Sequence, residues 1–305
     1  MKEDFKEIEE QLSKRAGDRL QAYFSDDQVE HLFLLAKSDI GVCRNGGRRG
    51  TRYAAQNIMN CLKKMQVQNG ESLSLKEKTV ITDRDAHDFN RLQEKEIENI
   101  TQGLAESSKN IIHFGGGHDH VYPLLKSIEK ESRKILVINI DAHLDTRTDE
   151  LYHSGTPFRQ FANETTGEFK LIQLGIHDFA NAKSNYQKLK TGEMDIYGLD
   201  QMREWTKSFT QNISPKLDEL TENFRDYTVV LSLDCDALSS DIMSGVSAVN
   251  HKGIPANCVE QIFTWYKELK QERKYLGIYE YNPLFDDLSQ KGARYLSALI
   301  YAFLF

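Results

Sequence analysis

Five short apolar segments, separated by segments with helical periodicity, constrain the fold of this chain more than any other feature. Each is rich in β-branched or aromatic residues and nearly continuous in hydrophobicity, which is typical of strands buried on both faces of a parallel sheet. The segments are NIIHF (110–114), KILVINI (134–140), KLIQLGI (170–176), YTVVLSL (227–233) and KYLGIYE (274–280). Because they alternate with helical segments, the sequence predicts an α/β fold with a doubly wound sheet.

Two of the intervening segments show clear helical patterns, HVYPLLKSIEKES (120–132) and PANCVEQIFTWYKELKQE (255–272). In the second, Pro255 suits a first helical turn, and a single apolar stripe follows. The stripe consists of Val259, Ile262, Phe263, Tyr266 and Leu269. Residues 1–24 are predicted to form an amphipathic helix. The final segment, 295–305, has about half of the roughly 20 apolar residues needed to cross a bilayer, so we expect a core-facing helix and no membrane span.

The chain lacks internal repeats and Pro/Gly/Ser linkers, which favours one domain over residues 1–305. We expect an N-terminal helical extension over 1–37 and a catalytic core over 38–305. The net charge of −7 and the scattered Lys and Arg residues disfavour nucleic acid as a partner. The charged N-terminus lacks the apolar region of a secretory signal, and the four cysteines lack disulfide or zinc-ribbon spacing, so we expect a cytoplasmic protein.

Polar residues follow the predicted strands at the point where each one ends. GGGHD follows the first, DAHLD the second, HD the third and DCD the fourth, while Glu280 closes the fifth. Functional groups in open α/β sheets gather at the carboxyl ends of the strands. We therefore expect these segments to meet at one edge of the sheet.

The spacing within two of these motifs predicts a metal site. Side chains alternate along an extended backbone, so Asp141, His143 and Asp145 project to one side, as do Asp234 and Asp236. Cys235, between the last two, should point away from them into the core. So many carboxylates in a buried cleft require a cation, and His118 completes a set of six ligands. Six exceed the usual three protein ligands of a catalytic zinc and suit two metal ions. The oxygen-rich set favours manganese, with zinc, nickel and cobalt as alternatives. Taken singly, His120, His177 and Asp178 are better explained as helix caps or loop residues.

The motifs together resemble the ureohydrolase family, which comprises arginases, agmatinases and formimidoylglutamases. The resemblance covers roughly residues 38–305. It is carried by GGGHD (115–119), DAHLD (141–145), SLDCD (232–236) and EYNP (280–283), with weaker support from NGGRRG (45–50). It implies a three-layer α/β domain with a mainly parallel eight-stranded sheet, two Mn²⁺ per subunit and a homo-oligomeric assembly.

The resemblance also implies a role for each site residue. His118 and Asp145 would bind one metal ion, and His143 and Asp236 the other. Asp141 and Asp234 would bridge the two ions, and a hydroxide held between the ions would attack the amidine carbon of the substrate. Glu280 would hold the positively charged amidine group.

Three segments resemble formimidoylglutamases more than arginases or agmatinases: HSGTPFRQ (153–160), GVSA (245–248) and LGIHDFANAKSNY (174–186). We therefore expect hydrolysis of N-formimidoyl-L-glutamate to L-glutamate and formamide, a step of histidine degradation. That substrate carries two carboxylates, for which Arg147, and less directly Arg159 or Arg49, are candidate receivers. An ordinary surface ion pair is the alternative for each arginine.

Two departures from the family pattern bear on the site. Ser154 aligns with the histidine proton shuttle of arginases and agmatinases, and His153, next to it, is a candidate general acid. Ser244 replaces a proline expected before Gly245. The alternatives are a ureohydrolase for another guanidino compound, such as an arginase, agmatinase or guanidino-acid hydrolase, and an inactive metal-binding or regulatory homologue.

Overall fold

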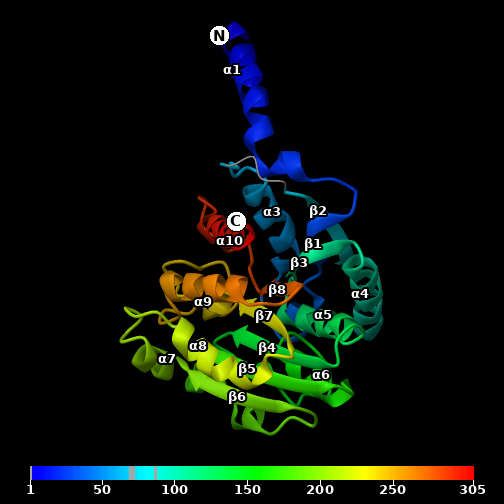
Figure 1. Ribbon diagram of the computed structural model, residues 1–305, viewed down its shortest axis with the longest axis vertical. Helices are drawn as coiled ribbons and strands as arrows, with labels where there is room; N and C mark the ends of the chain where they lie inside the picture. The colour runs from blue at the N-terminus through cyan, green and yellow to red at the C-terminus, as the bar shows by residue number, and fades with distance from the viewer. Residues whose placement is uncertain (1, 69–72, 86–87) are drawn as a thin grey trace.

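The computed structural model describes residues 2–68, 73–85 and 88–305 and contains an eight-stranded sheet with helices on both faces (Figure 1). The strands lie in the order β2-β1-β3-β8-β7-β4-β5-β6, and every neighbouring pair is parallel. Their bounds are β1 (Val29–Lys37), β2 (Leu75–Thr82), β3 (Ser107–Phe114), β4 (Lys134–Ile140), β5 (Glu168–Ile176), β6 (Glu193–Gly198), β7 (Thr228–Asp234) and β8 (Lys274–Tyr279). The predicted α/β fold is confirmed, and the five predicted strands correspond to β3, β4, β5, β7 and β8.

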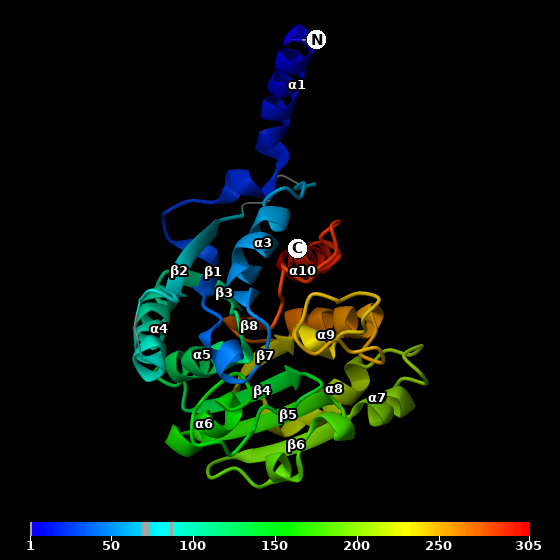
Figure 2. The same ribbon diagram turned by 180° about the vertical axis from the view of Figure 1, so that it is seen from behind.

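The helices cover the sheet in two layers, which gives the three-layer arrangement seen from opposite sides in Figures 1 and 2. Helices α4, α5 and α6 pack on one face, and α3, α7, α8, α9 and α10 pack on the other. The helix bounds are α1 (Lys2–Lys14), α2 (Ile40–Arg44), α3 (Ala54–Leu62), α4 (Phe89–Leu104), α5 (Val121–Ile128), α6 (Pro157–Glu164), α7 (Leu199–Trp205), α8 (Ser214–Thr221), α9 (Ala256–Glu268) and α10 (Lys291–Leu304).

The core is divided by the sheet because successive residues of a strand point to opposite faces. In β4, Val137 belongs to the cluster under α4, α5 and α6, whereas Ile138 belongs to the cluster under the other helices. Both side chains are fully buried. This explains why the central strands are apolar at nearly every position.

Neither edge strand of the sheet, β2 or β6, is among the strands predicted from the sequence. In β2 only Leu75, Val80 and Ile81 are buried, and the side chains of β6 are partly or fully exposed. An edge strand is covered by neighbours on fewer sides, so its sequence tolerates polar residues and loses the continuous apolar pattern.

The N-terminal region differs from the prediction. Helix α1 ends at Lys14 and extends away from the rest of the molecule in both views (Figures 1 and 2). Strand β1, Val29–Lys37, pairs with both β2 and β3. The predicted boundary after residue 37 is therefore wrong, because it would remove an integral strand from the sheet.

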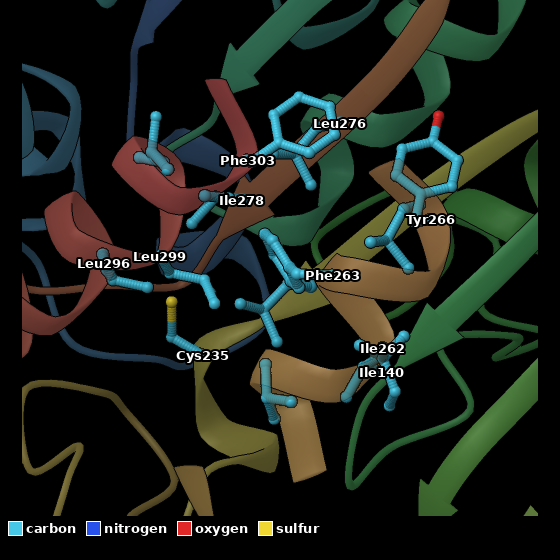
Figure 3. Packing of buried hydrophobic residues seen from close by; sticks show 14 of the residues in the cluster. Ile140, Cys235, Ile262, Phe263, Tyr266, Leu276, Ile278, Leu296, Leu299 and Phe303 are labelled. Carbon is cyan, nitrogen blue, oxygen red and sulfur yellow. The ribbon is translucent and has the colours of Figure 1, made fainter. Parts of the chain in front are cut away.

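The C-terminal helix α10 packs on the core, as predicted, with Leu296 and Leu299 buried. Figure 3 shows the sulfur of Cys235 turned toward these two residues of the core. This confirms that Cys235, although it lies between two predicted ligands, belongs to the core. In the described ranges, no helix combines the length and the apolar character that a membrane crossing requires.

Candidate metal centre

Four adjacent central strands place the predicted site residues at one edge of the sheet: β3, β7 and β4 are followed by the metal ligands, and β8 by Glu280. The register pairs Ile140 of β4 with Leu233 of β7, so the next residues, Asp141 and Asp234, emerge side by side. Strand β3 ends at Phe114, and the glycine run after it leads to His118. The level ends of these strands bring together residues that are more than 100 positions apart in sequence.

The first group of ligands surrounds the imidazole of His118. Its Nδ1 lies 2.9 Å from Asp145 Oδ2, 3.1 Å from Asp141 Oδ2 and 3.2 Å from Asp234 Oδ2. The ligand atoms of the four residues lie within 4.8 Å of one another, and all four side chains are buried. This spacing can hold one metal ion.

The second group consists of Asp141, His143 and Asp236. His143 Nδ1 lies 3.1 Å from Asp236 Oδ2 and 3.7 Å from Asp141 Oδ1. Asp141 therefore contributes one oxygen to each group, as a bridging ligand must. In the described part of the chain, Asp234 belongs to the first group only, so its bridging role stays a prediction.

Neighbouring groups fix the orientation of these ligands. Ser232 Oγ lies 2.8 Å from Nε2 of His118, which leaves Nδ1 to face the carboxylates. The backbone N–H of His143 donates to Asp141 at 2.7 Å, and that of Asp236 donates to Asp234 at 2.9 Å. Outer hydrogen bonds of this kind orient metal ligands in proteins.

The electrostatics of the cluster fit a bound cation. Burial disfavours a charge on His118, but the carboxylates of Asp141, Asp145 and Asp234 around its ring outweigh this effect and raise the pKa of His118 well above the usual value. Burial, and then the charges of Asp236 and Asp141, raise the pKa of Asp234. Within the described chain, Nδ1 of His118 finds no hydrogen bond of good geometry although three carboxylates surround it. A buried nitrogen left in this way is suited to binding a metal ion.

Glu280 follows β8 directly and faces the same pocket. Its φ of 62° lies in the left-handed region, which is unfavourable for a residue with a side chain, and Asp145 has a φ of 49°. Burial, and then the charges of Asp236 and Asp145, raise the pKa of Glu280 to about 8. A cationic partner would lower this pKa again, so the position suits a positively charged group of a ligand.

Four of the six ligands, His143, Asp145, Asp234 and Asp236, line a pocket of about 260 Å³. Arg147 lines the pocket and donates from Nη1 to Asn45 Oδ1 at 3.0 Å. Asn45 in turn donates to Ser154 Oγ at 3.1 Å. Arg147 is thus held at the pocket, where it was expected.

Arg48, which sequence reasoning missed, also lines the pocket. Its Nη2 donates to the carbonyls of Val246 and Ser247, and its guanidinium lies 4.3 Å from the ring centroid of Phe285. Arg49, the residue expected there, faces a different depression beside Asp39 and Asp83. The motif NGGRRG correctly placed residues 45–50 near the site. A loop has no periodicity, however, so the sequence does not show which of its two arginines points into the pocket.

The structure does not support a pocket role for Arg159. Its guanidinium lies outside the pocket and donates to three backbone carbonyls, those of Thr146, Gln187 and Lys188. All three guanidinium nitrogens thus form hydrogen bonds that connect α6 to neighbouring loops. Arg159 is therefore not placed to bind a substrate carboxylate in the pocket.

His153 also lies outside the pocket lining, whereas Ser154 belongs to it. The His153 ring accepts from the backbone N–H of Gly155 at 3.0 Å, and its Nε2 lies 2.8 Å from Asp149 Oδ2. Both ring nitrogens are thus engaged in holding the loop. This placement argues against His153 as the general acid.

Comparisons with known proteins agree with the geometry. The model of the Arginase family matches residues 35–305. This chain belongs to the arginase family. A formimidoylglutamase of Legionella pneumophila (strain Lens) is 30% identical over 285 residues, which cover 89% of this chain and 83% of that protein. A formimidoylglutamase of Cupriavidus pinatubonensis is 27% identical over 283 residues, which cover 87% of this chain and 84% of that protein. The predicted family resemblance is confirmed.

Solved structures support the arginase-family fold. A variant of Trypanosoma cruzi formiminoglutamase with Mn²⁺ superposes with a TM-score of 0.77 at 24% identity, covering 94% of this chain and 96% of that one. The formimidoylglutamase of Bacillus subtilis superposes with a TM-score of 0.77 at 21% identity, covering 94% of this chain and 90% of that one.

Proposed function

We propose that this arginase-family hydrolase is a formimidoylglutamase, which converts N-formimidoyl-L-glutamate and water to L-glutamate and formamide. The observation that carries the proposal is that Glu280, Arg147 and Arg48 line the same pocket as four of the predicted metal ligands. One anionic and two cationic side chains match a substrate with a cationic amidine and two carboxylates. The names of the curated relatives agree.

Two Mn²⁺ ions are proposed to occupy the two ligand groups, one held by His118, Asp141, Asp145 and Asp234 and the other by Asp141, His143 and Asp236. The oxygen-rich ligand set and the Mn²⁺ in the solved relative support this choice. When bound, the pair of ions would supply an ionised water at neutral pH.

The side chains of this chain would orient the substrate for that attack. Glu280 holds the amidine by its charge, while Arg147 can form a bidentate pair with one carboxylate. Arg48 has Nη2 committed to the loop carbonyls, so Nε and Nη1 are the donors it can offer to the second carboxylate. Binding at both ends would place the amidine carbon over the metal ligands and reduce the entropic cost of the reaction.

The competing proposal is a ureohydrolase that acts on another guanidino compound. A substrate panel on manganese-loaded protein separates the two, with formimidoylglutamate, arginine, agmatine and a guanidino acid compared at equal concentration. We expect glutamate and formamide from the first compound as the dominant reaction. Urea from arginine or agmatine, with no glutamate from the first compound, would overturn the substrate assignment and leave the metal centre intact.

An inactive homologue with a binding or regulatory role is the proposal of another class. The D141A variant removes the residue shared by both ligand groups, so turnover should fall to background and bound manganese should fall below two ions per chain. A binding protein should keep its partner after this change. The cytoplasmic location, a homo-oligomeric state and a role in histidine degradation remain predictions.

A further inference from the structure

We propose that a buried hydrogen-bonded chain behind the metal centre fixes the ring of His118 for metal binding. The chain consists of Tyr279, His113, Glu96 and His120. It joins helix α4 to strands β3 and β8 and to the short helical turn His118–His120. The inference rests on the proposed metal centre and is independent of the substrate.

Between Tyr279 and Glu96 the hydrogen bonds of the chain run in one direction. His113 Nδ1 lies 3.1 Å from the Tyr279 hydroxyl, and its Nε2 lies 3.2 Å from Glu96 Oε1. A carboxylate accepts, so His113 must donate from Nε2 and accept from the tyrosine through Nδ1. The order of donors and acceptors is therefore fixed between Tyr279 and Glu96.

The far end of the chain is anchored on the backbone. The second carboxylate oxygen of Glu96 lies 2.7 Å from His120 Nδ1, and His120 Nε2 lies 3.1 Å from the carbonyl oxygen of Ser38. The carbonyl can only accept, so Nε2 carries a hydrogen, and the short contact to Glu96 must hold a further proton. Each polar atom of the chain thus has a partner, which makes the arrangement rigid.

The near end of the chain touches the metal ligand. The ring of Tyr279 stacks on the His118 imidazole, with 4.9 Å between ring centroids and 23° between ring planes. The ring of Phe158 packs against the same imidazole in a T-shaped arrangement, with 5.3 Å between the ring centroids. The tyrosine also lies against the backbone at Gly115, where an added Cβ would lie 2.5 Å from its ring. A tyrosine held by its hydroxyl therefore holds the plane of the His118 ring.

Packing alone does not explain these polar residues. Glu96, His113 and His120 are at most 1% exposed, on a face where α4 and β3 mostly bury apolar side chains. Apolar residues would fill the space without the cost of removing polar groups from water. Because buried polar networks specify one arrangement of their members, we infer that these residues act as positioning residues for His118.

The test compares Y279F with Y266F. The first change removes the hydroxyl that joins the chain and keeps the stacking ring. Tyr266 is the matched control, since it is equally buried and its hydroxyl accepts from the backbone N–H of Tyr275 in another part of the core. The dissociation constants of both Mn²⁺ ions are measured on metal-depleted full chain by titration with electron paramagnetic resonance, and Tm is measured without metal.

We expect Y279F to weaken one of the two Mn²⁺ sites roughly tenfold, at the low end of the effect of outer-shell changes. Y266F should lower Tm and leave both constants within about twofold of the wild type. E96Q should also raise the dissociation constant of the same Mn²⁺ site. In the E96Q/Y279F double variant this constant should be no higher than in the single variant with the larger effect, because both substitutions break the same chain.

A Y279F protein that has a lowered Tm but wild-type manganese constants would overturn the inference while the metal centre stands. Additive effects of E96Q and Y279F would also overturn it, since they would show two independent roles. A wild-type chain that binds no manganese would overturn the proposed metal centre and this inference together.

Discussion

The Glu280 carboxylate accepts a hydrogen bond from the backbone N–H of His118 at 3.3 Å. The residue proposed to hold the substrate amidine is therefore tied to the backbone of a proposed metal ligand, although 162 positions separate the two. The contact exists because β3 and β8 are neighbours whose ends lie level, with Phe114 paired to Ile278. One strand pair thus sets the distance between the proposed substrate anchor and the metal centre.

The E280Q variant tests the role of the charge at this position. The amide oxygen of glutamine can still accept from His118, so the metal centre should persist, but the attraction for a cationic amidine is lost. We expect kcat/KM to fall at least about thirtyfold, consistent with a cost of about 2–5 kcal/mol for a buried charge pair that loses one partner. Steady-state kinetics and metal content are measured together. A variant within fivefold of wild-type kcat/KM would contradict the assignment.

The R147M variant tests recognition of a carboxylate. Loss of a hydrogen-bonded charge costs about 1.5–3 kcal/mol, so KM for formimidoylglutamate should rise roughly ten- to a hundredfold. R159M is the control, because Arg159 bonds only to backbone carbonyls outside the pocket. It should lower Tm and leave KM unchanged. Equal effects of the two substitutions on KM would exclude a specific role for Arg147.

The S232A variant tests whether the hydroxyl of Ser232 orients the His118 ring for metal binding. Ser232 lies 2.8 Å from the Nε2 of His118, and such outer contacts are worth roughly ten- to a hundredfold in metal affinity. The control is S297A, which removes another buried hydroxyl that bonds only to the carbonyls of Ile58 and Ala293. Manganese titration should separate the two variants. Indistinguishable dissociation constants would show that Ser232 does not orient the ligand.

His31 should make the stability of the metal-free chain depend on pH. Burial lowers its pKa to about 4, from 6.5 in an unfolded chain, and Asn110 Nδ2 lies 2.9 Å from its Nδ1. Between these values the unfolded chain binds more protons, so stability is full above pH 6.5 and is lost as pH falls toward 4. From pH 7 to 5 the loss is roughly 2 kcal/mol.

The H31Q variant removes this titration. Urea unfolding with EDTA at pH 7 and pH 5 should show that the stability difference between the wild type and H31Q shifts by roughly 2 kcal/mol in favour of the variant at the lower pH. Parallel losses in both proteins would mean that His31 is not the group responsible.

The sequence predicted the parts of this molecule where one local pattern dictates one environment. An apolar run such as 134–140 can only be a buried strand, and carboxylates directly after it must lie at the end of the sheet. The ligands Asp141 and Asp234 follow from this reasoning. Cys235 could be assigned to the core from the same alternation, and the structure confirms it.

Other parts depend on contacts between distant segments, which no local pattern contains. Glu96 lies in an amphipathic helix, and nothing in the sequence of that helix shows that Glu96 forms hydrogen bonds with His113 and His120. Arg48 and Arg49 are neighbours in a loop, and only the position of Val246 and Ser247 decides which one lines the pocket. The edge strands β2 and β6 lack a continuous apolar pattern because solvent replaces one of their neighbours.

The most direct test of the central claim is an anomalous diffraction map at the manganese edge from crystals of the chain grown with Mn²⁺. The geometry predicts two peaks in each chain, one among His118, Asp141, Asp145 and Asp234, and the other among Asp141, His143 and Asp236. A single peak, or manganese bound anywhere other than at these six side chains, would contradict the two-metal centre.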